Sequence, residues 1–438
     1  MRIAPFFEAL ALPLFFLLFS CAGSPNAYRE IDAEVSAASY DAALRAMEKS
    51  GVRNSVYTNK NAILYYLDRG MIRHYAEYWE ESSRDLQEAE RLIEAAFTRS
   101  ISQEIGSYIA NDNAKDYSGE DYEDLYINVF NALNYYHRND MEGALVEIRR
   151  VNEKLRYLSG KYERASEKII SSNADLSNPE YAVEAVRFSN SALAQYLGML
   201  FFRGIGNYDS ARISLEELYQ AYQLAPAVYN HAPPSSLEAE LSIPQGFARL
   251  NVIGFAGLSP VKVEVNAMIP LPLPYPNNWA RLALPQMIDR PSAVQSIEVI
   301  LDDGQSFRLE LLENMSRVVR ETFKANYSLI ILKTVARTIA KSVTGAAVSS
   351  RVSESNEDWG FLLGLIGRVA ADLSEQADTR VSRYFPGYAY AGGINLIPGV
   401  YTVTVRYYGR SGLIYSERRS NVMVSSGSLN LLEFVCLK

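Results

Sequence analysis

The residue whose setting points most directly to chemistry is Cys21, one of two cysteines among 438 residues. It follows an apolar run, Leu10–Phe19, and the small residue Ser20. The run is too short to cross a bilayer as a helix, and it fits the hydrophobic region of a secretory signal peptide. A thiol at this position can accept a diacylglyceryl group, and the α-amine freed by cleavage can accept a further acyl chain. The pattern therefore predicts lipidation at Cys21.

Leu18-Phe19-Ser20-Cys21 resembles a lipobox, although Phe19 is bulkier than the residue that many lipoboxes carry there. Two or three acyl chains anchor a protein stably. We therefore expect a lipoprotein signal peptide over residues 1–20, a tether over residues 21–28 and a membrane partner reached through the lipid. An uncleaved signal anchor, or ordinary cleavage beside an incidental cysteine, remains an alternative. Ala22 is not acidic, which favours the outer membrane; the periplasmic face is favoured and surface exposure stays open.

Other sources of chemistry are sparse. If Cys21 is acylated, Cys436 has no partner for a disulfide within the chain, and we expect it to be a buried small residue. The three histidines, His74, His137 and His231, form no His-x-x-x-His pair, and we expect each at a surface or a helix end. The sequence has no P-loop and no Gly-x-Ser-x-Gly elbow. We therefore predict no metal, no cofactor and no enzymatic activity.

Charged residues narrow the partners further. The formal net charge is −8 and no long basic run occurs, which argues against a nucleic-acid partner. The acidic loop 111–121 fails the calcium-loop register, and Ser118 before Asp121 favours a helix N-cap instead. Asp378 and Arg380 favour a structural ion pair. Because 51 acidic residues offer many carboxylate pairs, a cell-envelope hydrolase stays a weak alternative.

The elements that position these residues fall into two halves. Residues 29–232 have a helical pattern with few prolines, and three places share a large residue, a small residue three positions later, and apolar residues four and seven beyond that. This pattern resembles the turn and second helix of tetratricopeptide repeats, in which the small residue lets two helices approach closely. The spacing of the three places is unequal, so we expect an irregular helical-repeat domain. The predicted packing residues are Trp79, Ser82, Leu86 and Ala89; Met141, Ala144 and Ile148; and Tyr208, Ala211 and Leu215.

The second half is predicted to be rich in strands. Prolines from 226 to 244 mark a boundary, and residues 245–438 are expected to form a β-sandwich-like domain. A helical insertion is expected at about 313–379, and the stretch Pro270–Pro276 must be extended. The fold class is therefore α+β. The predicted strands are 249–255, 261–267, 294–301, 306–311, 399–406, 413–417 and 429–437, with Asp303-Gly304 as a hairpin turn.

Four stretches carry a resemblance to a known family: residues 111–123, 142–150, 375–380 and 398–401. They resemble an uncharacterised family of bacterial lipoproteins with tetratricopeptide-like N-terminal helices and a β-rich C-terminal region. The resemblance extends from the lipidation site to the C-terminus. It implies a lipoprotein with this two-part architecture, and it implies no catalytic residues.

Together these features predict a protein-binding scaffold of the bacterial cell envelope, which binds a protein partner through the concave face of its repeats. A glycan-binding or peptidoglycan- or polysaccharide-synthesis accessory lipoprotein is the alternative. The 30 tyrosines, against 3 tryptophans, suit helix-repeat interiors and wet binding faces alike, because a tyrosine ring packs while its hydroxyl stays polar. The glycan alternative would use tyrosine-rich surfaces.

Overall fold

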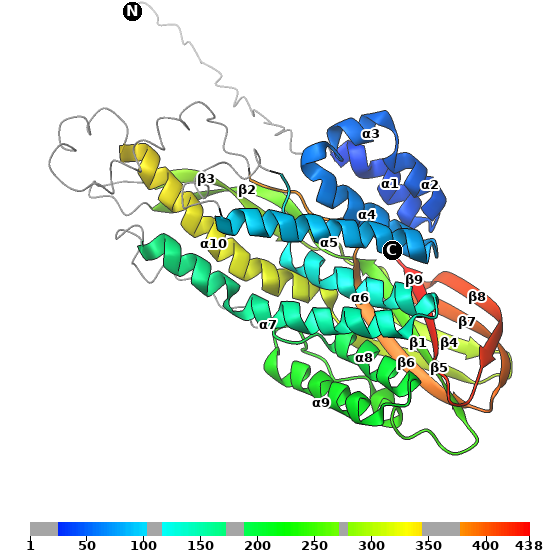
Figure 1. Cartoon of the computed structure of the whole chain (residues 1–438). Coiled ribbons are helices and arrows are strands. Elements are labelled where there is room, and N and C mark those ends of the chain that lie inside the picture. Colours follow the sequence, from blue (N-terminus) through cyan, green and yellow to red (C-terminus); the bar gives the residue numbers. More distant parts are fainter. Residues whose placement is uncertain (1–24, 103–115, 172–187, 271–278, 344–376) are drawn as a thin grey trace, which may run out of the picture.

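The computed structural model describes residues 25–102, 116–171, 188–270, 279–343 and 377–438 (Figure 1). Several features predicted from the sequence lie outside these residues. They are the signal peptide, Cys21, residues 111–115 of the acidic loop, residues 271–276 of the proline stretch and residues 344–376 of the insertion.

The first half of the chain is helical, and its helices form successive hairpins (Figure 1). The helix α1 begins at Pro25, so residues 25–28 of the predicted tether are helical; proline is favoured in a first helical turn because its missing N–H needs no partner there. The helices are α1 Pro25–Ser36, α2 Tyr40–Met47, α3 Ser50–Ser55, η1 Asn59–Asn61, α4 Ala62–Tyr75, α5 Trp79–Ser102, α6 Asp121–His137, α7 Met141–Ser171, α8 Ala192–Gly204, α9 Tyr208–Leu224 and η6 Ser235–Ala239.

One turn geometry recurs in four hairpins: α1–α2, α4–α5, α6–α7 and α8–α9. In each, the residue two positions after the first helix has a left-handed backbone, with φ of 56° at Ala38, 62° at Glu77, 61° at Asn139 and 77° at Gly206. The next N–H then donates to the carbonyl five residues earlier, as from Tyr78 to Arg73 and from Asp140 to Tyr135, both at 2.9 Å. These bonds satisfy carbonyls that a helix end leaves unpaired. The turn therefore ends one helix and starts the next within three residues.

Seven strands form one sheet, in the order β8-β7-β4-β5-β6-β1-β9, and β2 and β3 form a separate pair. The pairing of β1 with β9 is parallel, whereas β1 pairs antiparallel with β6. The strands are β1 Ala248–Leu258, β2 Val261–Pro270, β3 Trp279–Ile288, β4 Ser296–Leu301, β5 Ser306–Glu313, β6 Pro386–Leu396, β7 Gly399–Gly409, β8 Gly412–Val424 and β9 Asn430–Cys436.

The large sheet curls, so that its end strands β8 and β9 contact each other. Apolar side chains from strands across the curl form one core, including Val252, Ile297 and Tyr407. Gly254 allows this closeness, because a Cβ there would lie 2.8 Å from the Leu309 side chain and 3.0 Å from that of Ile297. The core expected between two sheets of a sandwich is thus formed within one curled sheet.

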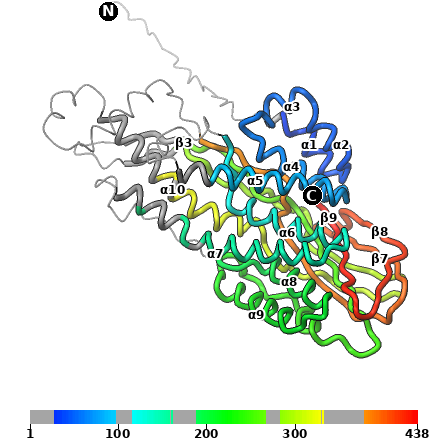
Figure 2. Tube along the Cα trace, viewed as in Figure 1, coloured from blue at the N-terminus to red at the C-terminus, as the bar shows by residue number. Residues whose placement is uncertain are grey.

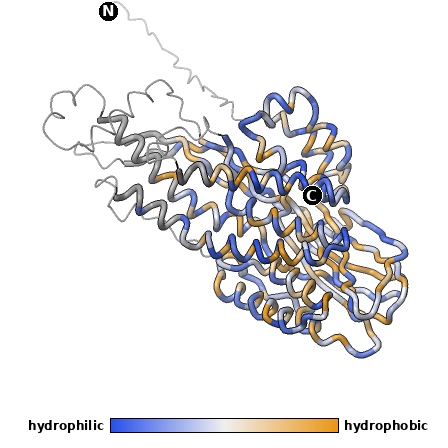
Figure 3. The backbone as a smooth tube through the Cα atoms, in the orientation of Figure 1, coloured by the Kyte–Doolittle hydropathy of each residue, from blue (hydrophilic) through white to orange (hydrophobic). Residues whose placement is uncertain are grey.

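The other face of the curled sheet is covered by helices (Figure 1), and the apolar residues recur along the strands and the helices beside them (Figure 3). A second core joins both halves of the chain: Phe130 of α6 contacts Phe255 of β1 and Phe385, with ring centroids 5.2 and 5.9 Å apart. The ranges 29–232 and 245–438 therefore share one hydrophobic core.

The predicted insertion contains the helix α10, Met315–Val343, which starts just after β5 and packs against α6, α7, β3 and β6. The trace in Figure 2 shows α10 beside α7, which it contacts, although these two helices are far apart in the sequence. Residues 377–385 are not helical, and they lead into β6.

Candidate functional site

A cavity of about 520 Å³ opens where four parts of the chain meet: the α1–α2 turn, the α4–α5 turn, β8 and β9. The turn geometry described above places Ser39, Tyr40 and Glu77 at its rim, and strand alternation aims Tyr415, Glu417 and Arg419 of β8 toward it. The buried residues His74 and Glu433 form part of its wall. Polar and aromatic side chains therefore converge here from segments distant in the sequence.

The floor of the cavity is a carboxylate held by two imidazoles. His74 Nε2 lies 2.7 Å from Glu433 Oε1, and His137 Nε2 lies 3.1 Å from Oε2 of the same carboxylate. The His74 side chain has no exposed surface, and that of Glu433 is 6% exposed. These bonds connect α4 and α6 to the last strand of the sheet.

The hydrogen bonds around His74 fix where its protons lie. Ser82 Oγ donates its single hydrogen to the Gly70 carbonyl at 2.8 Å, so it must accept from Asn134 Nδ2 at 2.9 Å. Asn134 Oδ1 then faces His74 Nδ1 at 2.7 Å and accepts from it. Because the other ring nitrogen faces the Glu433 carboxylate, each nitrogen of His74 faces an acceptor, an arrangement that suits an imidazolium beside a carboxylate.

Electrostatics at Glu433 agree with this arrangement. Burial by itself raises the pKa of this carboxyl group, but the charge of His74 and the hydrogen bonds from His137 and His74 together hold the pKa well below its usual range. The carboxylate therefore stays ionised in the folded protein, although it is buried.

The polar side chains that β8 contributes to the cavity wall are also paired, with one another and with the α4–α5 turn. Arg419 donates to Glu417 Oε1 at 3.0 Å and to Glu77 Oε1 at 2.8 Å, and Tyr415 donates to Glu417 Oε2 at 3.2 Å. The Trp79 ring stacks on His137, with centroids 4.1 Å apart and planes 14° apart. Burial raises the pKa of Tyr415 to about 12, so its hydroxyl keeps its proton at neutral pH.

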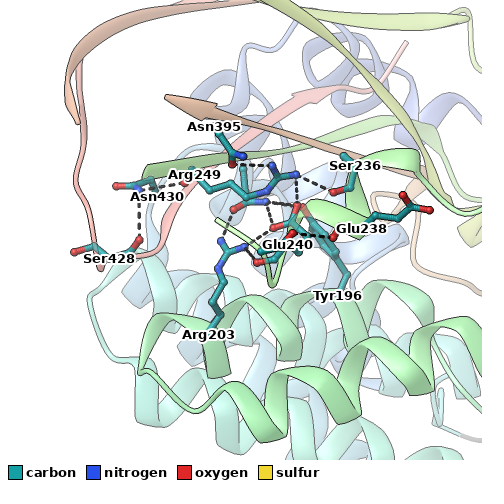
Figure 4. A network of polar contacts seen from close by, with 11 residues as sticks. Tyr196, Arg203, Ser236, Glu238, Glu240, Arg249, Asn395, Ser428 and Asn430 are labelled. Atoms are coloured by element: carbon teal, nitrogen blue, oxygen red, sulfur yellow. Dashed lines mark hydrogen bonds and ion pairs between the residues drawn. The ribbon is translucent and has the colours of Figure 1, made fainter. Parts of the chain in front are cut away.

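Two other buried polar clusters have a structural role. In one, Glu240 pairs with both Arg203 and Arg249, at 2.8 Å for the latter, and Asn251 of β1 joins them (Figure 4). Figure 4 shows Arg203 reaching from a helix toward the sheet. Because each charge has a partner, the cluster joins α8, η6 and β1 without exposing a reactive group.

In the other cluster, buried carboxylates bind the segment that precedes β6. Asp68 accepts from Ser382 Oγ at 2.7 Å and from the Arg383 N–H at 2.9 Å, and Glu123 accepts from the Ser382 N–H at 2.6 Å. Burial raises the pKa of Asp68 to about 6; burial, with the charge of Glu120, raises that of Glu123 to about 7. Both carboxylates are fully buried and bound by these donors, so they hold the segment in place.

The residues predicted to pack between the helices lie at the starts of α5, α7 and α9. Ser82, Leu86, Ala89, Ala144 and Ala211 have no exposed surface, and Ile148 is 3% exposed. Met141 and Leu215 are partly buried against the same core, as Trp79 is against His137. Tyr208 differs, because 54% of its surface is exposed.

Several single-residue predictions are corrected or confirmed. His74 lies at a helix end, in the last turn of α4, as predicted, but it is fully buried, because Asn134 and Glu433 satisfy both its nitrogens. The cap of α6 is Glu120, in a reciprocal capping box with Glu123, rather than Ser118. Cys436 is buried, as predicted, and burial raises the pKa of its thiol.

Asp378 and Arg380 form the predicted ion pair, with Nη2 2.8 Å from Oδ2. The sequence analysis missed Glu433, Tyr40 and Arg419 as cavity residues. A single signal was available: Glu433 is a charged residue within an otherwise apolar final strand.

In the part of the chain that the structure describes, no group of three or more His, Cys, Asp or Glu side chains is placed to hold a metal ion. Within the same residues, every helix is too short or too polar to cross a membrane. The fold and site thus define a mixed helix-and-sheet protein in which helical hairpins cover a curled sheet and a polar cavity lies at their junction. Comparison of the chain with protein-family models, curated proteins and solved structures gives no significant match.

Proposed function

We propose that this chain is a lipoprotein of the bacterial outer membrane, anchored through Cys21, which acts as a protein-binding scaffold in the cell envelope and not as an enzyme. The hairpins with their shared turn support an array of divergent tetratricopeptide-like units. The single curled sheet, whose end strands meet, supports a sandwich-like region with its core inside the curl. Since α1 begins at Pro25, residues 21–24 span at most about 14 Å, which would hold the folded body close to the bilayer.

The surface available to a partner is the outer side of the array. The first helices α4 and α8 face the sheet: His74 Nε2 of α4 lies 2.7 Å from Glu433 Oε1 of β9, and Arg203 of α8 donates to Asn251 of β1 at 2.6 Å. The second helices α7 and α9 keep large apolar side chains exposed, and this is the observation that carries the proposal. Exposed fractions are 45% for Tyr157 and 43% for Val146 of α7, and 50% for Ile213 and 62% for Leu224 of α9.

Crosslinking in cells, followed by purification of the chain, tests the scaffold. We expect a discrete partner that is lost in the variants Tyr157→Glu and Ile213→Glu. The variant Met423→Glu, in β8, serves as the control because Met423 is also an exposed apolar residue, at 63%, but lies on the sheet. A partner retained by all three variants, or no partner, would contradict the proposal.

The anchor is tested separately by Cys21→Ser. Loss of the thiol removes the site of acylation, so we expect the variant to leave the membrane fraction and to lose its partition into detergent. Unchanged fractionation and electrophoretic mobility would show that Cys21 carries no lipid.

A glycan is the second candidate partner, and the junction cavity favours it. Tyr40, Trp79 and Tyr415 contribute aromatic rings to the wall, and charged side chains surround them.

A further inference from the structure

We infer that the junction cavity is a saccharide-binding site that takes a neutral sugar residue of a glycan chain. The inference rests on the second candidate function, glycan binding, and it does not depend on a protein partner. The volume of the cavity, about 520 Å³, lies within the range of small-molecule sites.

The paired charges of the wall indicate a neutral ligand. Glu433 is held by two histidines, and Arg419 is held by Glu417 and Glu77. Beside Glu433 and Arg419, a ligand with a net charge would have to break one of these pairs or enter without a counter-ion, and both are costly in a partly buried site. The charges of Asp41 and Arg45 lie on exposed residues of the wall and are opposite in sign, so together they add no net charge. A neutral ligand leaves every pair intact.

The remaining hydrogen-bonding groups of the cavity wall include both donors and acceptors. Among the residues that the structure describes, the Tyr40 hydroxyl, the Trp79 indole N–H and the Arg45 guanidinium have no hydrogen-bond partner, and all three residues line the cavity. Asp41 accepts one bond from Tyr78 at 2.9 Å, and the lone pairs of its second oxygen remain available. The wall thus offers donors and acceptors together, which suits hydroxyl groups, because each hydroxyl both donates and accepts.

The aromatic rings of the cavity wall suit the apolar faces of a sugar ring. A pyranose ring has C–H groups on its faces, which carry a small positive charge, and the face of an aromatic ring is negative. Tyr40, Trp79 and Tyr415 come from α2, α5 and β8, so the cavity presents rings from three directions. Hydroxyl-binding groups beside aromatic rings make a saccharide the class of ligand that uses both parts of the wall.

Saturation-transfer NMR on the full-length chain in detergent tests this inference. The probes are neutral trisaccharides of glucose, galactose and N-acetylglucosamine, with tri-lysine and tri-glutamate as charged probes. We expect saturable transfer to at least one trisaccharide. Tyr40→Phe keeps the ring and removes one hydroxyl, so affinity should fall about fivefold, and Trp79→Phe should have a similar effect.

The matched control for Tyr40→Phe is Tyr388→Phe, in β6, which makes the same chemical change outside the cavity wall. Sugar binding that this control weakens as much as the cavity variants, or that no variant weakens, would overturn the inference. Absence of transfer to all three trisaccharides would do the same.

Transfer to a charged tripeptide alone, lost in Tyr40→Phe, would show that the cavity binds a ligand but not a sugar. That result would leave a binding function in place. The crosslinking experiment and the Cys21→Ser fractionation report on the scaffold and the anchor independently of every sugar result.

Discussion

The buried pair of His74 and Glu433 allows a quantitative test of the site's electrostatics. The atoms are 2.7 Å apart, and the two side chains are 0% and 6% exposed. Removing one member of such a pair leaves the other charge in a site with little water, which costs about 3–5 kcal/mol of unfolding free energy. We expect a loss within this range for Glu433→Leu, and a loss at its lower end for His74→Leu, because His137 still contacts Glu433 at 3.1 Å.

The double variant should lose less than the sum of these two effects. With both groups replaced by leucine no charge of the pair remains buried, and the residual cost comes from the unsatisfied Asn134 amide and altered packing. We expect the double variant to be more stable than additivity predicts by at least about 2 kcal/mol. Urea unfolding at pH 7, followed by circular dichroism, measures all four proteins.

The exposed pair Arg212–Glu216 is the matched control. Its atoms are 2.8 Å apart, but its side chains are 60% and 57% exposed, so its coupling should stay below about 1 kcal/mol. Additive effects of the two leucine substitutions at His74 and Glu433, with a coupling no larger than that of the control, would refute the ion pair.

The same pair predicts a dependence on pH. Because the pKa of Glu433 is lower in the folded state than in the unfolded state, its stabilising contribution is present above the unfolded value of about 4.3 and is lost as the pH falls through the folded value. The stability difference between the wild type and Glu433→Leu should therefore shrink below about pH 4.

Other predictions concern the buried carboxylates and the helix contacts. The pKa of Glu123 is raised from 4.5 to about 7, so the folded state binds this proton more tightly, and about 3 kcal/mol of stability present at pH 4 is lost as the pH rises through 7. Glu123→Gln should remove that part of the slope in urea unfolding; an unchanged slope would contradict the prediction. At Gly70 a Cβ would lie 2.8 Å from Leu86, so Gly70→Ala should cost about 1–3 kcal/mol in thermal or urea unfolding. Gly51→Ala, with no atom within 4 Å, should be neutral or stabilising, and equal effects of the two alanines would contradict the close approach.

Two strands were missed in the sequence, and each has a physical explanation. β6 contains Gly387, Gly392 and Gly393, which weaken the strand signal; a Cβ at Gly393 would lie 3.0 Å from the Leu250 carbonyl, so the close approach of β1 requires glycine. β3 contains Pro285, which cannot donate to a neighbouring strand and is tolerated in this two-stranded pair. At both strands the residue types suit the tertiary contacts rather than the local strand propensity.

The sequence by itself determined the features that neighbouring residues specify. The starts of α5, α7 and α9 at Trp79, Met141 and Tyr208, and the hairpin at Gly304 with its φ of 87°, depend on contacts or backbone angles within a few residues. Such local preferences are present in the chain before it folds, so the pattern of residue types reveals them.

Only the tertiary structure decided which of these elements meet. His74 and Glu433 are 359 residues apart, and β9 lies beside β1 because of the strand order, which the alternation of residues within either strand does not encode. Burial of apolar surface has no preferred direction, so a helix sequence does not specify which partner its apolar side will contact. The first helices pack on the sheet because that arrangement buries apolar surface of both. The cavity and its ion pair exist only as a consequence of that packing.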